Sequence, residues 1–223
     1  MERLSIIVPY RNRKLHLKEF IPHMEKTDQL EGIDYEILII EQRDEKPFNR
    51  GKLLNIGVSL CLEESSYFCF HDVDMLPTKC DYSPCVKPTH LASQVQQFDW
   101  KLPYDKYFGG VTLFDKKSFV IINGFDNDYW GWGAEDDDLR FRCESSGISI
   151  DRRDGRFLSL NHDKNVNHEL YNTNLEKYRE LKSSKSLEEA VRRINANGLS
   201  SLEYEKITEE RISERTRKIL VRI

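Results

Sequence analysis

Three short apolar runs constrain the fold of this chain more than any other feature of its sequence. Leu4–Tyr10 is nearly continuous in apolar residues, and Tyr35–Ile40 and Tyr67–Phe70 are similar runs further along. Such runs are typical of strands that are buried on both faces of a parallel sheet. Helical patterns follow the first two runs, near Leu15 and after Arg50. This alternation predicts an α/β fold with a mostly parallel central sheet and right-handed crossovers.

The second half of the chain contains shorter and less regular patterns. Residues 76–106 form a long excursion that contains several prolines, and a new strand is expected to begin at Tyr107–Val111. A helix is predicted from Glu135 to Ser146, where Gly147 ends it. The other expected elements are a short helix at 119–124, short strands at 148–151 and 156–160, a mobile loop at 161–174, one or two helices at 175–196 and an edge strand at Arg217–Ile223.

Composition narrows the class of protein. The net charge of −4 gives no reason to expect a nucleic-acid partner, and no apolar run approaches the roughly 20 residues of a transmembrane helix. Five scattered cysteines argue against a secreted disulfide framework, so we expect a cytoplasmic protein. The basic residues between Arg211 and Arg222 are interpreted as a solvated face, with peripheral attachment at the inner face of a membrane as the alternative.

Charged residues follow the predicted strands at their carboxyl ends, where ligands bind in α/β sheets. Asp72 and Asp74 come directly after the third strand, separated by an apolar residue. Carboxylate oxygens suit Mg²⁺ or Mn²⁺, and either ion can bridge a diphosphate. Arg11, Arg13 and Arg50 fall at the same edge, and guanidinium groups match phosphate geometry. The pattern predicts a site for a nucleoside diphosphate and a divalent cation.

The composition of the stretch Tyr129–Asp138 is unfavourable for an ordinary loop or helix start. Two tryptophans and two glycines run directly into four consecutive acidic residues. Acidic residues suit the positive end of a helix dipole, but that effect explains one or two of them better than four. We interpret the stretch as a sugar-binding and acid/base site at a helix start, with Gly131 and Gly133 as hinges. Asp138 is expected to cap the helix.

His162 is a candidate metal ligand. A lone histidine is more often structural or exposed. This one follows a predicted strand and begins the polar loop, a position that would couple metal binding to loop closure.

Taken together, these segments resemble the beta-1,4-galactosyltransferase family of GT-A glycosyltransferases. The matching segments occur in the family's order across nearly the whole chain. The block from Trp130 to Asp138 is the most specific of them. The others are 9–13, 48–55, 72–74, 107–110, 123–125, 162–163 and 198–202.

The resemblance implies a GT-A fold and an activity. The expected fold is a single domain over residues 1–223, with a nucleotide-binding half at 1–106 and an acceptor and catalytic half at 107–223. The expected reaction moves galactose from UDP-galactose to the 4-hydroxyl of an acceptor sugar, with inversion and with Mn²⁺, or alternatively Mg²⁺. The acceptor would belong to polysaccharide or oligosaccharide synthesis, and a lipid-linked saccharide is one alternative.

The resemblance also assigns roles residue by residue. Asp136 corresponds to the general base, and Asp74 and His162 to metal ligands. Trp132, Asp136 and Asp137 correspond to acceptor-binding residues, and Tyr107 sits where the family selects the donor sugar. The donor-site residues that the resemblance implies are Pro9, Arg11, Arg13, Phe48, Arg50, Asp72, Val73, Lys101, Tyr107, Gly110, Trp132 and Glu135.

The chain departs from the family at the metal site. Some relatives carry a methionine three residues before the metal histidine and others a histidine two residues before it, where this chain has Ser159 and Leu160. The third protein ligand is therefore missing or replaced. Two alternatives stay open: a UDP-N-acetylgalactosamine or UDP-glucose transferase on the same scaffold, and a non-catalytic sugar-binding homologue. The intact Asp72, Asp74 and Asp136 argue against the second.

Overall fold

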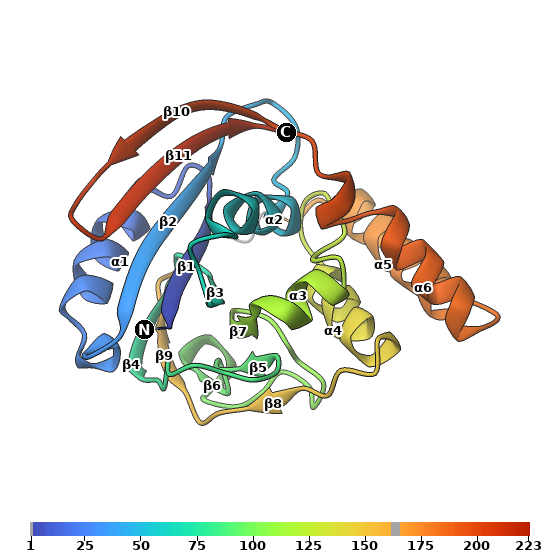
Figure 1. Ribbon diagram of the computed structural model, residues 1–223, viewed down its shortest axis with the longest axis horizontal. Coiled ribbons are helices and arrows are strands. Elements are labelled where there is room, and N and C mark those ends of the chain that lie inside the picture. The colour runs from blue at the N-terminus through green and yellow to red at the C-terminus, as the bar shows by residue number, and fades with distance from the viewer. Residues whose placement is uncertain (1, 162–165) are drawn as a thin grey trace.

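The computed structural model describes residues 2–161 and 166–223, and within them eight strands form one central sheet (Figure 1). Strands β11–β2–β1–β3 pair in parallel and form its middle, while β10, β7 and β5 pair antiparallel to their neighbours on one side or both. In spatial order the strands are β10 (Glu205–Arg211), β11 (Thr216–Arg222), β2 (Asp34–Gln42), β1 (Arg3–Tyr10), β3 (Tyr67–His71), β7 (Val111–Asp115), β5 (Thr89–His90) and β8 (Asp151–Arg152).

The apolar runs are buried because helices cover both faces of the sheet. Ile6 of β1 packs in one core with Phe20 of helix α1 (Lys14–Lys26). The next residue, Ile7, points to the other face and packs in a second core with Leu53 of helix α2 (Arg50–Cys61). Successive side chains of a strand point to opposite faces, so one continuous apolar run serves both cores. The predicted α/β architecture with its mixed, mostly parallel sheet is confirmed.

The excursion after the third strand is more ordered than the sequence predicted. It contains β4 (Met75–Lys79), β5, β6 (Gln94–Val95) and the short 3₁₀ helix η2 (Gln96–Phe98). Strands β4 and β6 both pair with β9 (Arg156–Ser159) and form a second small sheet, which was not predicted. Two other short 3₁₀ segments are η1 (Asp28–Leu30) and η3 (Leu199–Ser201).

The helices of the second half of the chain lie together, on the right of the view in Figure 1. The short helix α3 (Lys116–Ile121) packs beside β7, and α4 (Glu135–Ser145) follows the tryptophan-rich stretch as predicted. Helices α5 (His168–Lys182) and α6 (Leu187–Ala196) pack on α4. In the part of the chain that the structure describes, no helix is long and apolar enough to cross a membrane.

Three expectations about these elements were wrong. The mobile loop expected at 161–174 falls partly on residues 162–165, outside the described residues, and its later part is helical: α5 begins at His168, where Asn167 caps the helix by accepting from the N–H groups of Glu169 and Leu170. Of the strand expected at 148–151, only Asp151 lies in a strand, at the start of β8. The C-terminal strand β11 lies inside the sheet, because β10 covers its outer side.

Candidate active site

Three side chains that are far apart in the sequence meet at the carboxyl end of the sheet. Asp72 follows β3, Arg50 begins α2 and Asp136 lies in the first turn of α4. The Nε of Arg50 lies 2.7 Å from Oδ1 of Asp72, and its Nη1 lies 2.8 Å from Oδ1 of Asp136. The side chains of Asp72 and Asp136 remain 27% and 22% exposed, so one arginine joins two carboxylates that solvent still reaches.

Local sequence explains why Arg50 is placed there. Asn49 caps α2, because its side-chain oxygen accepts from the main-chain N–H of Lys52 at 2.9 Å. The amide of Asn49 donates to the main-chain oxygen of Asn127 at 2.7 Å, which ties the helix start to the segment before the tryptophans. Arg50 is therefore the first helical residue beside that segment.

The charge around Asp136 favours its protonated form. Burial raises the pKa of Asp136 well above the usual value of a carboxyl group, and Arg50 opposes this rise. Repulsion from Glu135, Asp72 and Asp137 raises the pKa further. Burial also raises the pKa of Glu135. A carboxylate whose pKa is shifted upward in this way is better suited to accept a proton than an ordinary one.

The segment Tyr107–Gly110 forms a wall against Asp136. A Cβ atom on Gly109 would lie 2.4 Å from Oδ2 of Asp136 and 2.9 Å from the hydroxyl of Tyr107. No side chain fits in that space, so glycine is required at this position. Gly110 accepts from the main-chain N–H of Asp72 at 3.1 Å, which holds the wall against the end of β3.

Tyr104 belongs to the same wall and was not predicted. Its hydroxyl donates to Oδ1 of Asp137 at 2.9 Å, and its ring contacts Tyr107 with 5.6 Å between centroids. The side chain is 45% exposed. The available signal in the sequence was a tyrosine three residues before Tyr107, next to Pro103, because an aromatic side chain there offers both a stacking face and a hydroxyl.

The tryptophan segment lies between the donor-side residues and helix α5. Trp132 is 57% exposed, and its ring stacks on Tyr171 of α5 with 5.4 Å between centroids. The amide of Asn174 donates to the main-chain oxygen of Trp130 at 3.0 Å. Gly133 has φ of +107°, and a Cβ there would meet the Tyr171 ring at 2.7 Å. The segment therefore needs glycine both for its backbone conformation and for the close approach of α5.

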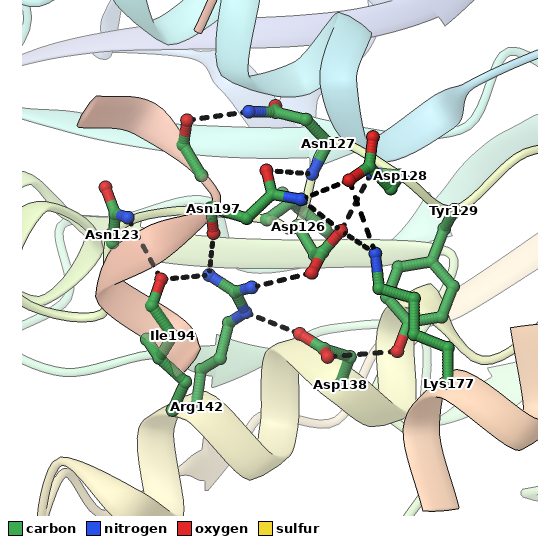
Figure 2. A network of polar contacts seen from close by, with 12 residues as sticks. Asn123, Asp126, Asn127, Asp128, Tyr129, Asp138, Arg142, Lys177, Ile194 and Asn197 are labelled. Atoms are coloured by element: carbon green, nitrogen blue, oxygen red, sulfur yellow. Dashed lines mark hydrogen bonds and ion pairs between the residues drawn. The ribbon is translucent and has the colours of Figure 1, made fainter. Parts of the chain in front are cut away.

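Asp138 was expected to cap α4, and this prediction was wrong. Its Oδ1 accepts from Nε of Arg142 at 2.5 Å, and its Oδ2 accepts from the hydroxyl of Tyr129 at 3.0 Å (Figure 2). Arg142 also pairs with Asp126 at 3.3 Å, and Lys177 of α5 reaches the same carboxylate at 2.5 Å. The fourth acid of the run thus faces a buried network, on the side of α4 away from Asp136.

The remaining predicted donor residues lie in several segments, and of these Arg11, which follows β1, contacts Phe48. The guanidinium of Arg11 lies 5.4 Å from the centre of the Phe48 ring, and its Nη1 donates to the main-chain oxygen of Lys46 at 2.6 Å. Pro9 and Val73 are buried, Arg13 precedes α1, and Lys101 is exposed after η2. Arg11, Phe48 and Arg50 therefore share one end of the sheet.

The predicted metal site is only partly within the described residues. Asp74 is half-buried, and its main-chain oxygen accepts from the N–H of Leu160 at 2.8 Å, so the chain that leads toward His162 runs beside it. His162 itself lies outside the residues that the structure describes. Within 2–161 and 166–223, no group of three or more His, Cys, Asp or Glu side chains is arranged to hold a metal ion. The carboxylate of Asp74 suits a hard divalent cation that completes its ligand set with phosphate oxygens.

Comparisons with known proteins agree with this geometry. Residues 1–83 match the family model described as the N-terminal region of glycosyl transferase group 7, and residues 89–169 match the one described as the N-terminal domain of galactosyltransferase. Mouse beta-1,4-galactosyltransferase 4 is 36% identical over 94% of this chain and 60% of its own length. The chain spans between 43% and 60% of the length of such curated relatives.

Solved structures show the same fold. The catalytic domain of Drosophila beta-1,4-galactosyltransferase 7, solved with xylobiose, aligns over 100% of this chain and 94% of its own, with a TM-score of 0.82 and 26% identity. A mutant of that enzyme solved with manganese, UDP-Gal and xylobiose aligns over the same shares, with a TM-score of 0.76 and 25% identity. The fold is the GT-A fold that the resemblance implied. The chain belongs to the beta-1,4-galactosyltransferase family.

Proposed function

We propose that this chain is an inverting, metal-dependent galactosyltransferase that moves galactose from UDP-galactose to a hydroxyl of an acceptor sugar. The observation that carries the proposal is the bridge from Asp72 through Arg50 to Asp136, which joins the predicted donor side to the acidic run. The galactosyltransferase relatives and the neighbour solved with manganese and UDP-Gal support the choice of donor.

The donor would bind at the carboxyl ends of β1 and β3. Arg11 and Arg13 supply positive charge for the diphosphate, and the Phe48 ring supplies a flat apolar face for the base. Asp74 and His162 would hold Mn²⁺, or Mg²⁺ as the alternative, and such an ion neutralises charge on the leaving diphosphate. Asp72 and Arg50 hold the neighbouring wall of the pocket through their 2.7 Å ion pair.

The proton of the acceptor hydroxyl would pass to Asp136. As the hydroxyl oxygen attacks the anomeric carbon, the bond from that carbon to the UDP oxygen breaks and the proton comes to rest on the carboxylate. One base on the acceptor side and a leaving group on the opposite side give inversion. Arg50 keeps Asp136 in place by bonding to Oδ1, while Oδ2 lies toward Gly109 and Tyr107.

The acceptor sugar would lie between Asp137 and the exposed ring of Trp132. Tyr104 orients Asp137 by its hydrogen bond and offers its own ring as a second surface. Xylobiose bound to the Drosophila enzyme makes a β-linked xyloside a reasonable first acceptor to test.

The proposal is tested by incubating the protein with UDP-galactose, UDP-N-acetylgalactosamine and UDP-glucose, with and without Mn²⁺, while UDP release is followed. We expect metal-dependent turnover that is fastest with UDP-galactose and is stimulated by an acceptor glycoside. Absence of metal-dependent turnover with all three donors would defeat the proposal, and sugar binding without turnover would favour the non-catalytic alternative.

The donor assignment has its own test. Tyr107 is the residue at the donor-selecting position, so Tyr107→Leu should raise the rate with UDP-N-acetylgalactosamine relative to UDP-galactose. An unchanged ratio of the two rates would show that Tyr107 does not select the donor.

A further inference from the structure

The turn that carries Asp74 is held by main-chain hydrogen bonds. The N–H of Asp72 donates to Gly110, and the N–H of Met75 donates back to the main-chain oxygen of Asp72 at 3.2 Å. Leu160 donates to the main-chain oxygen of Asp74 at 2.8 Å. The carbonyl of Asp72 therefore closes the turn that contains Asp74.

A buried histidine bonds to that same carbonyl. The Nδ1 of His71 lies 3.0 Å from the main-chain oxygen of Asp72, and its Nε2 lies 3.0 Å from the hydroxyl of Tyr82. Phe20 and Phe157 meet the imidazole edge-on, with centroids at 5.1 and 6.0 Å, and the Tyr82 ring stacks on it at 6.2 Å. Aromatic rings from three separate segments thus fix the plane of the imidazole.

The chemistry of the two contacts fixes the tautomer. A carbonyl oxygen can only accept, so Nδ1 of His71 carries the proton. Burial lowers the pKa of His71 to about 4, which leaves the ring neutral near pH 7. The Nε2 atom of the neutral ring is then an acceptor, and the hydroxyl of Tyr82 donates to it. One directed chain of hydrogen bonds runs from Tyr82 through His71 to Asp72.

We propose that Tyr82 and His71 are positioning residues that fix the turn presenting Asp74 to a divalent cation. This inference rests on the proposed function, because it assumes that Asp74 binds the cation. Groups that orient a metal ligand from behind commonly change metal affinity about 10- to 100-fold when they are removed. Tyr82 lies in the irregular segment that follows the turn and β4, and this segment folds back so that the Tyr82 hydroxyl reaches His71.

The first test compares two buried tyrosines of the same cluster. Tyr82→Phe removes the hydroxyl that bonds His71 and keeps the ring that stacks on it. Tyr67→Phe is the matched control. The Tyr67 hydroxyl bonds the main-chain oxygen of Tyr82 at 3.0 Å and is not part of the hydrogen-bond chain from Tyr82 through His71 to Asp72. Mn²⁺ binding in the presence of UDP is measured by the paramagnetic resonance signal of free Mn²⁺, and thermal unfolding is measured alongside.

We expect Tyr82→Phe to weaken Mn²⁺ binding about 10-fold, while Tyr67→Phe stays within about 2-fold of the wild type at a similar loss of stability. Equal Mn²⁺ affinities for the two variants would overturn the inference. If the wild type binds no Mn²⁺ in the presence of UDP, both this inference and the proposed function are contradicted. If the wild type binds Mn²⁺ and the variants match it, this inference alone falls.

A second pair of variants decides the question should Tyr82→Phe fail to fold. His71→Asn keeps an N–H donor near the position of Nδ1, whereas His71→Leu removes it. The inference expects His71→Asn to bind Mn²⁺ more tightly than His71→Leu does. The reverse order, or equal affinities, would overturn it.

Discussion

Two arginines in this molecule each join two aspartates, and they do so in opposite surroundings. Arg50 joins Asp72 to Asp136, whose side chains are partly exposed. Arg142 joins Asp126 to Asp138 with its own side chain 1% exposed, and it also donates to the main-chain oxygens of Gly124, Ile194 and Asn197.

The difference shows which ion pairs serve the site and which serve the fold. A buried guanidinium that already bonds two carboxylates and three main-chain oxygens has no capacity left for a ligand, and removing it takes an ion pair from two buried carboxylates. An arginine at a partly exposed edge can exchange a carboxylate for a phosphate when a donor arrives. Asp136 and Asp138 are two residues apart on α4, yet they belong to these two different environments.

The largest expected effect concerns the candidate active site around Arg50. Asp136→Asn removes the proposed base, so turnover should fall about 10²- to 10⁴-fold. UDP binding should stay within a few-fold of the wild type, because Asp136 does not face the diphosphate in the proposal. Steady-state UDP release and a UDP titration measure the two quantities. Loss of UDP binding to the same degree as turnover would contradict the assignment of the base.

The next largest effect concerns the stability of the fold around the buried Arg142. Arg142→Met should lower the free energy of unfolding by about 3–5 kcal/mol, since it removes the ion pair of the buried Asp138 and one of the ion pairs of Asp126. Arg140→Met is the matched control on the same helix, where the exposed pair with Glu144 is worth less than about 1 kcal/mol. Urea unfolding compares the two, and a similar loss for both variants would remove the distinction between them.

The electrostatics of Asp136 predict a dependence on pH. Burial and neighbouring acids raise the folded-state pKa of Asp136 above its ordinary 3.8, so the stability tied to its protonated form is present below that value and is lost as the pH rises through the raised pKa. Asp136→Asn should therefore gain stability relative to the wild type over this window, by at most about 1.4 kcal/mol per pH unit.

The same ionisation should control activity. The acid limb of kcat/KM should lie above pH 3.8, because the base must lose its proton before it can act. Urea unfolding of both proteins between about pH 4 and 8 and a pH profile of the wild type are the measurements. A stability difference that does not change with pH would contradict the raised pKa.

The smallest expected effect concerns the acceptor wall. Tyr104→Phe removes the hydrogen bond to Asp137, and because the pair is exposed we expect the KM for the acceptor to rise only about 3- to 10-fold. The KM for the donor should not change. Tyr178→Phe, at a partly exposed tyrosine of α5 that packs on Phe141 of α4, is the control. Equal effects of both variants on the acceptor KM would exclude a specific role for Tyr104.

The central strands were predictable because their sequence signal matches their environment. Leu4–Tyr10 and Tyr35–Ile40 are buried on both faces, and a strand buried on both faces is apolar at nearly every position; Ser5 and Glu36 are the exceptions. Strand β10 was not predicted for the opposite reason. All of its residues are exposed, so nothing in Glu205–Arg211 had to alternate. Without that strand, β11 was placed at the edge.

The candidate site was predictable in its residue types but not in its pairing. Asp72, Arg50 and Asp136 were each singled out, yet their mutual contacts depend on how α2 and α4 meet at the end of β3. Asp138 shows the limit more clearly. Its spacing of four residues from Arg142 is a common ion-pair spacing on a helix, but position in the first turn also suits a cap, and only the buried surroundings decide between them.

The place of β11 in the sheet also bears on how the chain is synthesised. Its residues 216–221 pair with residues 37–42 of β2, so one neighbour of β2 is made long after β2 itself. At about 5–20 residues per second, β2 waits on the order of 10–35 s for that partner. An apolar strand with an open edge is a template for pairing with other chains. Until residues 216–221 have been made, this edge of β2 therefore stays open to pairing with other chains.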